Sequence, residues 1–362
     1  MTITIDTLFN DKDVVSAVIN RINQTRKDTV YWKQYLDFRR TTTRVFKDYI
    51  GSVQGVMAGS INSRYGEKQV RERKNIGYGY GEIAYLGDAY QMSIDRMSDL
   101  QDLIDKFNAA KPSDQSAVLN EIITFIADDY RQIMLAAHKR MDIVVGSLLM
   151  TASAKVINKD GNAGGTEMLD ISLPFKVITP EATVKNAFIS YLQEQMALLA
   201  PDYGSFSKMI MSRATFIKSV VGCTEFDTKF KYTFGGNKEY SLATGTITSQ
   251  MASEVFVGLG LPAIDIKSDY VKDQNGRNVQ IYADNRVTLL PQDKIGYMRF
   301  HTPYEAVDKV PGRNYTQTGE GDMLVSGYRD KEGRYLEYTA EWIPQISAPQ
   351  EIVNFDLSTM NA

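Results

Sequence analysis

An apolar stripe that continues from residue 113 to residue 154 is the feature that most constrains the fold. Its apolar side chains recur at steps of three and four, the spacing at which residues share one face of an α-helix. They are Leu119, Ile122, Ile126, Tyr130, Ile133, Ala137, Met141, Val144 and Leu148. A helix of this length would measure roughly 60 Å at ~1.5 Å per residue. The pattern therefore predicts one helix that spans the molecule, with Ser113 as its N-cap and Gly146 as a point where it could bend.

A second informative segment runs from residue 264 to residue 300. Residues 264–271 and 278–282 have the composition of strands, and they flank Asn275-Gly276, a dipeptide that favours a tight turn between antiparallel strands. The polar step Asp284-Asn285 then leads into an apolar run at 287–291. A further short apolar run follows at 295–298. We expect a hairpin, a buried strand and a second short strand in this order.

A glycine-rich segment precedes the long helix. Eight glycines and no proline lie between Gly51 and Gly87, and the apolar residues there follow no regular period. Such a segment cannot build a core of its own. It predicts an extended, twisted hairpin or arm that lies on another surface.

Weaker patterns predict the remaining elements. Helices are expected at 11–27, 93–112, 181–199 and 213–219, with a helical or mixed segment at 241–258. Strands are expected at 156–157, 168–173, 208–211, 335–342 and 351–355, the first two as a hairpin. Residues 307–327 are interpreted as a polar loop, and residues 343–349 as a break between the last two strands.

The composition places the chain among folded proteins and disfavours several functional classes. Hydrophobic residues make up 43% and charged residues 23% of the sequence, which suits a chain with a buried core. A net charge of −3 does not favour a protein whose main task is to bind nucleic-acid phosphates. Cys223 is the only cysteine, so an internal disulfide is excluded and a reducing cytoplasm suits the fold. We expect neither a signal peptide nor a membrane-spanning segment.

No motif for catalysis, cofactor binding or metal binding stands out. The two histidines, His138 and His301, are not part of an HExxH sequence, and we interpret His138 as a surface or interface residue. The glycines at 77–81 lack the spacing of a dinucleotide-binding loop. Asp128 and Asp129 are adjacent on the predicted helix, point in different directions and are interpreted as a solvated face. We therefore assign no catalytic, cofactor-binding or metal-binding residue.

A small basic cluster lies in the glycine-rich arm. It consists of Arg64, Lys68, Arg71, Arg73 and Lys74. One interpretation is a solvated arm; the other is ion pairing with acidic surfaces of neighbouring subunits. Both stay open, and these five residues are our candidates for inter-subunit contacts.

The order of these parts resembles the major capsid proteins of tailed bacteriophages, specifically the lambda-type major capsid protein E family with its Hong Kong 97-type fold. One part of the resemblance is the hairpin, the Asp284-Asn285 step and the apolar strand of residues 264–300. Another is the sequence of arm, very long helix and mixed α/β region. The third is the end of the chain, where Trp342 in a strand is followed by residues 345–349 and a last strand.

The resemblance implies an α+β fold with named parts. They are an N-terminal arm at 1–44, an E-loop at 45–92, a P-domain at 93–180 containing the spine helix 113–154 and the following hairpin, an A-domain at about 181–330, and C-terminal strands at 331–362 that return to the P-domain.

The resemblance also implies a function without catalysis or cofactors. Copies of the chain would assemble in the host cytoplasm into hexamers and pentamers of a virion shell, with the packaged DNA contacted only non-specifically. No long charged coiled coil precedes the arm, so a separate scaffolding protein is implied; a portal and a decoration protein are further candidate partners. Two alternatives stay open: an encapsulin-like compartment shell of the same fold, and a soluble hydrolase with an unrecognised carboxylate site.

Overall fold

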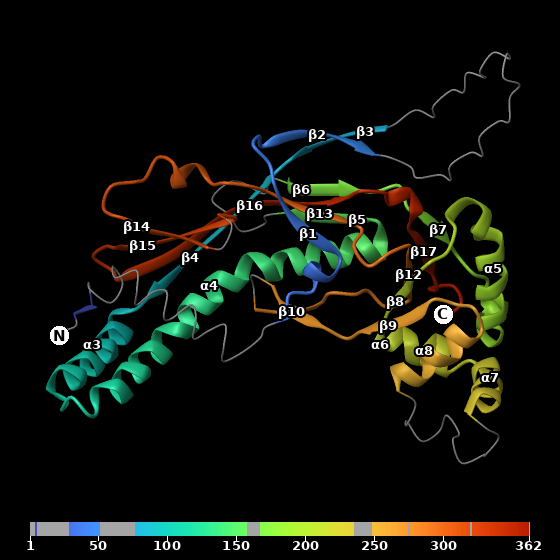
Figure 1. The fold of residues 1–362 in the computed structure, drawn as a ribbon, viewed down its shortest axis with the longest axis horizontal. Helices are drawn as coiled ribbons and strands as arrows, with labels where there is room; N and C mark the ends of the chain where they lie inside the picture. Colours follow the sequence, from blue (N-terminus) through green and yellow to red (C-terminus); the bar gives the residue numbers. More distant parts are fainter. Residues whose placement is uncertain are drawn as a thin grey trace, which may run out of the picture.

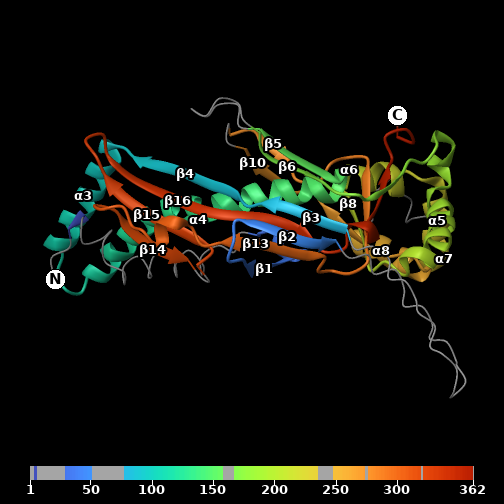
Figure 2. The same ribbon diagram turned by 90° about the horizontal axis from the view of Figure 1, so that it is seen from above.

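The computed structural model has an α+β architecture, with two mixed sheets and one long helix, α4, along the longest axis (Figures 1 and 2). The structure describes residues 4–5, 29–50, 77–157, 167–234, 248–273, 276–318 and 321–361. The helix predicted at 11–27 and most of the predicted arm, residues 51–76, lie outside the described residues.

Helix α4 (Gln115–Thr151) confirms the prediction of one long helix. Its 37 residues form a single helix, about 55 Å long at ~1.5 Å per residue, and its ends lie two and three residues inside the predicted bounds. The helix stops at Ala152, whose φ of 59° turns the chain into the next strand. The expected shorter helix before it is α3 (Ile94–Ala109), which lies beside the first half of α4 (Figure 1).

Gly146 of α4 allows a neighbouring segment of the chain to pack closely against the helix. A Cβ atom at this position would lie 2.4 Å from the backbone oxygen of Ile281 and 2.5 Å from its Cγ2 atom. Only glycine therefore allows the segment around Ile281 to lie directly against the helix. Helix α4 continues without interruption through this residue to Thr151.

The first sheet covers α4 and is organised around one long strand, β16. Its strands, in spatial order, are β1 (Leu36–Arg40), β13 (Gly296–His301), β16 (Arg334–Ile346), β15 (Met323–Arg329) and β14 (Asn314–Thr318), with β4 (Ala84–Met92) also paired with β16. Glu341 pairs with His301 of β13 and with Tyr85 of β4, whereas Ala340 pairs with Met323 of β15 and Leu86 of β4. Strands β13 and β15 therefore share one edge of β16, and β4 lies along the other.

The expected break at residues 343–349 is wrong over its first half. Strand β16 continues through Pro344 to Ile346 and pairs there with β13, Pro344 opposite Met298. Strand β4 ends opposite Trp342, so beyond that point only one edge of β16 has a neighbour. A proline, which has no N–H to donate, fits a strand where its nitrogen faces such an unpaired edge.

The second sheet lies at the other end of α4. Its order is β7 (Lys176–Ile178), β17 (Val353–Asp356), β12 (Arg286–Leu290), β8 (Lys208–Ser212) and β9 (Ala263–Lys267). Helices gather around this sheet (Figure 1): α5 (Phe188–Tyr203), α6 (Arg213–Thr215), a π-helix (Phe216–Val221), α7 (Thr224–Phe234) and α8 (Ser249–Gly258). Single 3-10 turns occur at Trp32–Gln34, Ala182–Asn186, Tyr304–Ala306 and Pro349–Glu351.

Three two-stranded hairpins complete the described strands. They are β2 (Val45–Ile50) with β3 (Gly77–Glu82), β5 (Ser153–Ile157) with β6 (Glu167–Ser172), and β10 (Tyr270–Lys272) with β11 (Asn278–Gln280). The last two confirm the predicted hairpins. The predicted strand 264–271 is nevertheless two strands, because β9 pairs with β8 in the second sheet and β10 begins a separate hairpin.

Several other expectations need correction. Residues 307–327 are not a loop, since β14 and most of β15 lie there as an antiparallel pair. Helix α5 begins at Phe188 rather than at residue 181, and α7 was not predicted. Neither sheet is contiguous in sequence: β13 to β15, within 181–330, join the first sheet, and β17, within 331–362, joins the second.

The Asp284-Asn285 step has a clear structural reason. Asn285 has a φ of 57°, a left-handed conformation that asparagine tolerates better than most residues. Its backbone oxygen accepts from the Leu357 N–H at 2.8 Å, and its side chain accepts from Asn361 at 2.9 Å. Asp284 accepts from the Ser212 hydroxyl at 2.5 Å. This step therefore links β12 to β8 and to the end of the chain.

Candidate functional site

The five predicted contact residues cannot be placed. Arg64, Lys68, Arg71, Arg73 and Lys74 all fall in 51–76, outside the described residues. What the structure does describe is the base of this arm, the antiparallel hairpin of β2 and β3. Among the described strands, this hairpin pairs with no other.

A buried carboxylate anchors the base of the arm. Glu341 of β16 is 3% exposed at its side chain and accepts two hydrogen bonds from Arg44, the residue directly before β2, at 3.1 Å from Nε and 2.5 Å from Nη2. His301 of β13 lies with Nδ1 2.8 Å from the same carboxylate. The Ile83 N–H donates to the Arg44 oxygen at 3.0 Å, which joins both ends of the arm at this point.

This Arg44–Glu341–His301 cluster was not predicted from the sequence. Its members are separated by about 40 to 300 positions, and only the register of β13 against β16 brings His301 opposite Glu341. Bidentate arginine–carboxylate pairs fix direction as well as distance. The cluster therefore fixes Arg44, and with it the start of β2, against β16 and β13.

His138, interpreted from the sequence as a surface or interface residue, is half-buried among aromatic rings. Its ring lies 4.8 Å from Trp342 and 5.7 Å from Trp32, ring centre to ring centre, with Phe38 at 6.2 Å. Burial, and then the charges of Lys33 and Lys139, lower the pKa of His138 to about 3. The imidazole is therefore neutral at pH 7 and acts as part of an aromatic cluster.

Asp142 is one turn further along α4 and fully buried. Its Oδ1 accepts from the Trp32 N–H at 2.9 Å, and its Oδ2 lies 3.6 Å from the Lys139 ammonium. Burial outweighs these contacts and raises the pKa of Asp142 to about 6. Asp129, predicted to be solvated, instead forms an ion pair with Arg96 of α3 at 3.0 Å.

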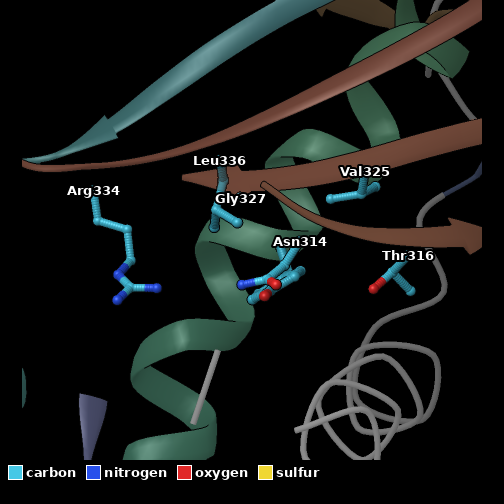
Figure 3. Close-up of a pocket in the computed structure, with 7 residues that line it drawn as sticks. Asn314, Thr316, Val325, Gly327, Arg334 and Leu336 are labelled. Carbon is cyan, nitrogen blue, oxygen red and sulfur yellow. The ribbon is translucent and has the colours of Figure 1, made fainter. Parts of the chain in front are cut away.

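The small cavity between the first sheet and α4 has no room for a substrate. Figure 3 labels the residues of β14, β15 and β16 that line it, and Tyr130 of α4 lines it as well. Its volume is about 20 Å³, room for about one water molecule. In the described ranges, no group of three or more His, Cys, Asp or Glu side chains is arranged to hold a metal ion. None of the helices described combines the length and apolar character needed to cross a bilayer.

A larger, open groove of about 1000 Å³ runs beside β4. Residues 84–90 of β4 form one wall, and residues of α4 between Arg131 and Val144 form the other. The hairpin strand β10 closes part of it, with Tyr270, Val271 and Lys272. This groove lies beside β4, which pairs with β16 on its other side.

Comparison with known proteins gives matches of structure alone. No protein-family model matches the chain, and no curated protein does. A solved structure of a candidate capsid protein from a prophage of Escherichia coli CFT073 aligns with a TM-score of 0.55 at 14% identity, over 98% of this chain and 99% of that one. A phage-related protein of Bordetella bronchiseptica RB50 aligns with a TM-score of 0.50 at 11% identity, over 96% and 98%. The chain shares the fold of these proteins along its whole length.

Proposed function

We propose that this chain, which has the Hong Kong 97-type fold, is the major capsid protein of a tailed bacteriophage. Copies assemble into hexamers and pentamers, and these form the icosahedral head shell around the double-stranded DNA genome. The observation that carries the proposal is the alignment with the candidate prophage capsid protein, which covers 98% of this chain and 99% of that chain. Because the match extends over both chains, it involves the arrangement of all parts rather than one common domain.

The surface of the subunit supports assembly. Among the described residues, the β2–β3 hairpin pairs with no other strand. Open strand edges favour uncontrolled association unless a specific partner covers them. In a shell built from one kind of chain, a neighbouring subunit can provide that cover, and contacts between unlike faces of successive copies close into rings.

The division into parts belongs to the same proposal. We assign residues 45–92 to the E-loop, and α4 to the spine helix. The first sheet with α3 and α4 then forms the P-domain, and the second sheet with α5 to α8 forms the A-domain. This assignment follows the two sheets rather than the bounds at residues 181 and 330 that the sequence suggested.

The proposed location is the virion, with assembly in the host cytoplasm. A scaffolding protein encoded separately, a portal and a decoration protein are the proposed partners, and the packaged DNA is contacted non-specifically. The proposed role requires no catalytic site and no cofactor. Residues that matter most for function are then those between subunits.

Particle mass tests the proposal directly. We expect the purified protein, expressed alone or with its scaffolding protein, to sediment as particles of megadalton mass and to show closed shells by negative-stain electron microscopy. The chain itself has a mass of 40.7 kDa. A product that stays a monomer or small oligomer under both conditions would contradict the proposal and favour the hydrolase alternative.

A further inference from the structure

Strand β4 is a long, unprotected edge of the first sheet. It pairs with β16 on one side and with no described strand on the other, and Figure 2 shows it along the outer edge of the sheet. Its nine residues include one charged residue, Asp88, and neither lysine nor proline. Natural sheets usually protect such an edge with charges, prolines or bulges, because its free N–H and C=O groups can pair with another strand. This edge therefore has the properties of one that is covered by a partner.

The groove beside this edge has the dimensions of an extended peptide. Residues 84–90 form one wall, which measures about 23 Å at ~3.3 Å per residue. The lining part of α4, residues 131–144, measures about 20 Å at ~1.5 Å per residue. A volume of about 1000 Å³ is at the upper end of the range for small-molecule sites, ~300–1,000 Å³. A strand added to β4 would lie between these two walls.

The walls of the groove carry an excess of positive charge. Four basic side chains line it, namely Arg131, Lys139, Arg140 and Lys272. The acidic side chains among the lining residues are Asp88 and Asp273. Both carboxylates keep their charge, and Lys139 is paired with the Asp142 carboxylate at 3.6 Å, so the excess rests on Arg131, Arg140 and Lys272. Charge complementarity therefore favours an occupant with acidic side chains.

Two segments of the chain itself fit this groove poorly. The arm segment 51–76 contains five basic and two acidic residues, so the positive walls would repel it. Near the N-terminus, Ile5 packs against the core, and Thr29 accepts from Lys139 at the edge of the groove, but residues 6–28 carry four acidic and four basic residues and so have no net charge to match the walls. A separate polypeptide fits the charge of the groove better than either segment.

We propose that this groove binds an extended acidic segment of a separate polypeptide, which adds to β4 as a further strand. Main-chain hydrogen bonds along the open edge would supply affinity, and the basic walls would select acidic over basic segments. The inference goes beyond the shell function, because all groove residues belong to one chain and binding does not require a closed particle.

Peptide binding to the full-length protein tests the charge preference. The probes are two end-capped eight-residue peptides, one alternating valine and aspartate and one alternating valine and lysine, each measured by fluorescence anisotropy. We expect the aspartate peptide to bind at least tenfold more tightly. Lys272→Glu should weaken its binding at least fivefold, whereas the control Lys185→Glu, the same charge change on an exposed residue outside the groove, should change it less than twofold. Equal affinity for the two peptides, or equal effects of the two variants, would overturn the proposal.

Backbone methylation of the aspartate peptide tests strand addition without altering the protein. One isomer is N-methylated at every odd residue and the other at every even residue, so each lacks the N–H groups of one strand edge. Addition to β4 predicts that one isomer loses at least tenfold in affinity while the other binds like the parent. Equal behaviour of both isomers would show that the peptide does not bind as a strand. A protein that forms no shells but binds in this way would contradict the shell function and leave the groove proposal intact.

Discussion

The two sheets of this molecule bury their strands in different ways. In the second sheet, β8 and β12 are each buried at four consecutive residues, so both faces of these strands are covered. In the first sheet, β13 alternates strictly between buried and partly exposed residues, whereas the central strands β15 and β16 are buried at four and at seven consecutive residues. Strands covered on both faces belong to a core that is complete within one chain. The centres of both sheets are such cores, and the first region differs in having, among the described strands, the alternating β13, the β4 edge and the separate β2–β3 hairpin.

Buried charge differs between the two regions as well. Among the described residues, five charged side chains are buried: Asp142, Arg334 and Glu341 lie in α4 and the first sheet, Asp322 directly precedes β15, and Lys267 lies in the second sheet. The centre of the second sheet instead contains neutral polar groups, where the Thr288 hydroxyl lies 2.7 Å from the Asn354 side-chain oxygen and 2.6 Å from the Leu149 oxygen. We therefore expect the first region to respond to pH and to charge substitutions more than the second.

The largest expected effect is that of removing the arm, which should abolish assembly and leave folding intact. The last described pair of the β2–β3 ladder is Ile50 with Gly77, so an Asn-Gly turn can replace residues 51–76 and close the hairpin. We expect a folded subunit, with circular dichroism like the full chain and a Tm within a few degrees, that forms no particles. Loss of the folded signal would show that the arm belongs to the core of the first region, and an unchanged particle yield would show that it has no role between subunits.

A single methyl group at Gly146 should test how tightly α4 is packed against the rest of the molecule. Gly146→Ala places a Cβ atom 2.4 Å from the Ile281 oxygen, and the backbone shift should outweigh the gain in helix propensity. We expect a net loss of about 2 kcal/mol in the free energy of unfolding, measured by urea denaturation.

Gly258 of α8 provides the matched control in the second region. A Cβ atom there would meet no atom within 4 Å, so Gly258→Ala should leave stability unchanged or raise it by up to about 1 kcal/mol. Equal effects of the two substitutions would mean that α4 can shift away from Ile281 at little cost.

These contrasts explain what could be predicted from the sequence. The long helix was predictable because its apolar residues, such as Ile122 and Ile133, face one core throughout. The buried strand at 287–291 was predictable because both of its faces are apolar. Strand β14, with the sequence NYTQT, was not predictable, since its polar residues form a strand only because β15 offers a partner.

The buried clusters were not predictable either, for a different physical reason. Arg44, His301 and Glu341 each resemble ordinary surface residues in sequence, and only long-range pairing brings them together. His138 is followed in its helix by Lys139 and Arg140, yet Trp32 and Trp342 from distant segments pack against its ring. Local sequence patterns predict which apolar faces are buried. They do not predict which polar residues become buried, because that depends on the register in which distant strands pair.

The third expected effect concerns the free energy of unfolding, which Asp142 and His138 make depend on pH in opposite directions. The folded state raises the pKa of Asp142 from 3.8 to about 6, so its stabilising contribution is complete below pH 3.8 and is lost as the pH rises through 6. The folded state lowers the pKa of His138 from 6.5 to about 3, so its contribution is complete above pH 6.5 and is lost as the pH falls through 3. Between pH 4 and 6, Asp142 therefore makes the unfolding free energy fall with rising pH, and His138 makes it rise.

Two variants should reveal this cancellation. As the pH rises from 4 to 6, the unfolding free energy of Asp142→Asn should increase by about 3 kcal/mol relative to that of the unmodified chain, at ~1.4 kcal/mol per pH unit. His138→Phe should lose a similar amount over the same interval, while Lys33 and Lys139 are present in both proteins. Urea denaturation at pH 4, 5 and 6 measures the two slopes. Parallel curves for all three proteins would show that neither side chain is titrated differently on folding.

The smallest expected effect on stability concerns the arm base, where the two regions can be compared through one kind of bond. Glu341→Gln removes the ion pair with Arg44 in the first region, and Asp356→Asn removes the ion pair with Arg286, 2.8 Å long, in the second. Arg44 is 54% exposed and can be rehydrated, so we expect each substitution to cost about 1–2 kcal/mol by urea denaturation.

Their effects on assembly should nevertheless differ. The Glu341 carboxylate fixes Arg44 and with it the start of β2, so Glu341→Gln should reduce particle yield severalfold at a protein concentration where Asp356→Asn assembles normally. The measurement is the sedimenting fraction at equal concentration and ionic strength, compared with the stability of each variant. If both variants lose particles in proportion to their loss of stability, the cluster stabilises the fold and does not direct the arm. If only Glu341→Gln loses particles, the Arg44–Glu341–His301 cluster of the first region contributes to assembly. The Arg286–Asp356 ion pair of the second region then contributes to stability alone.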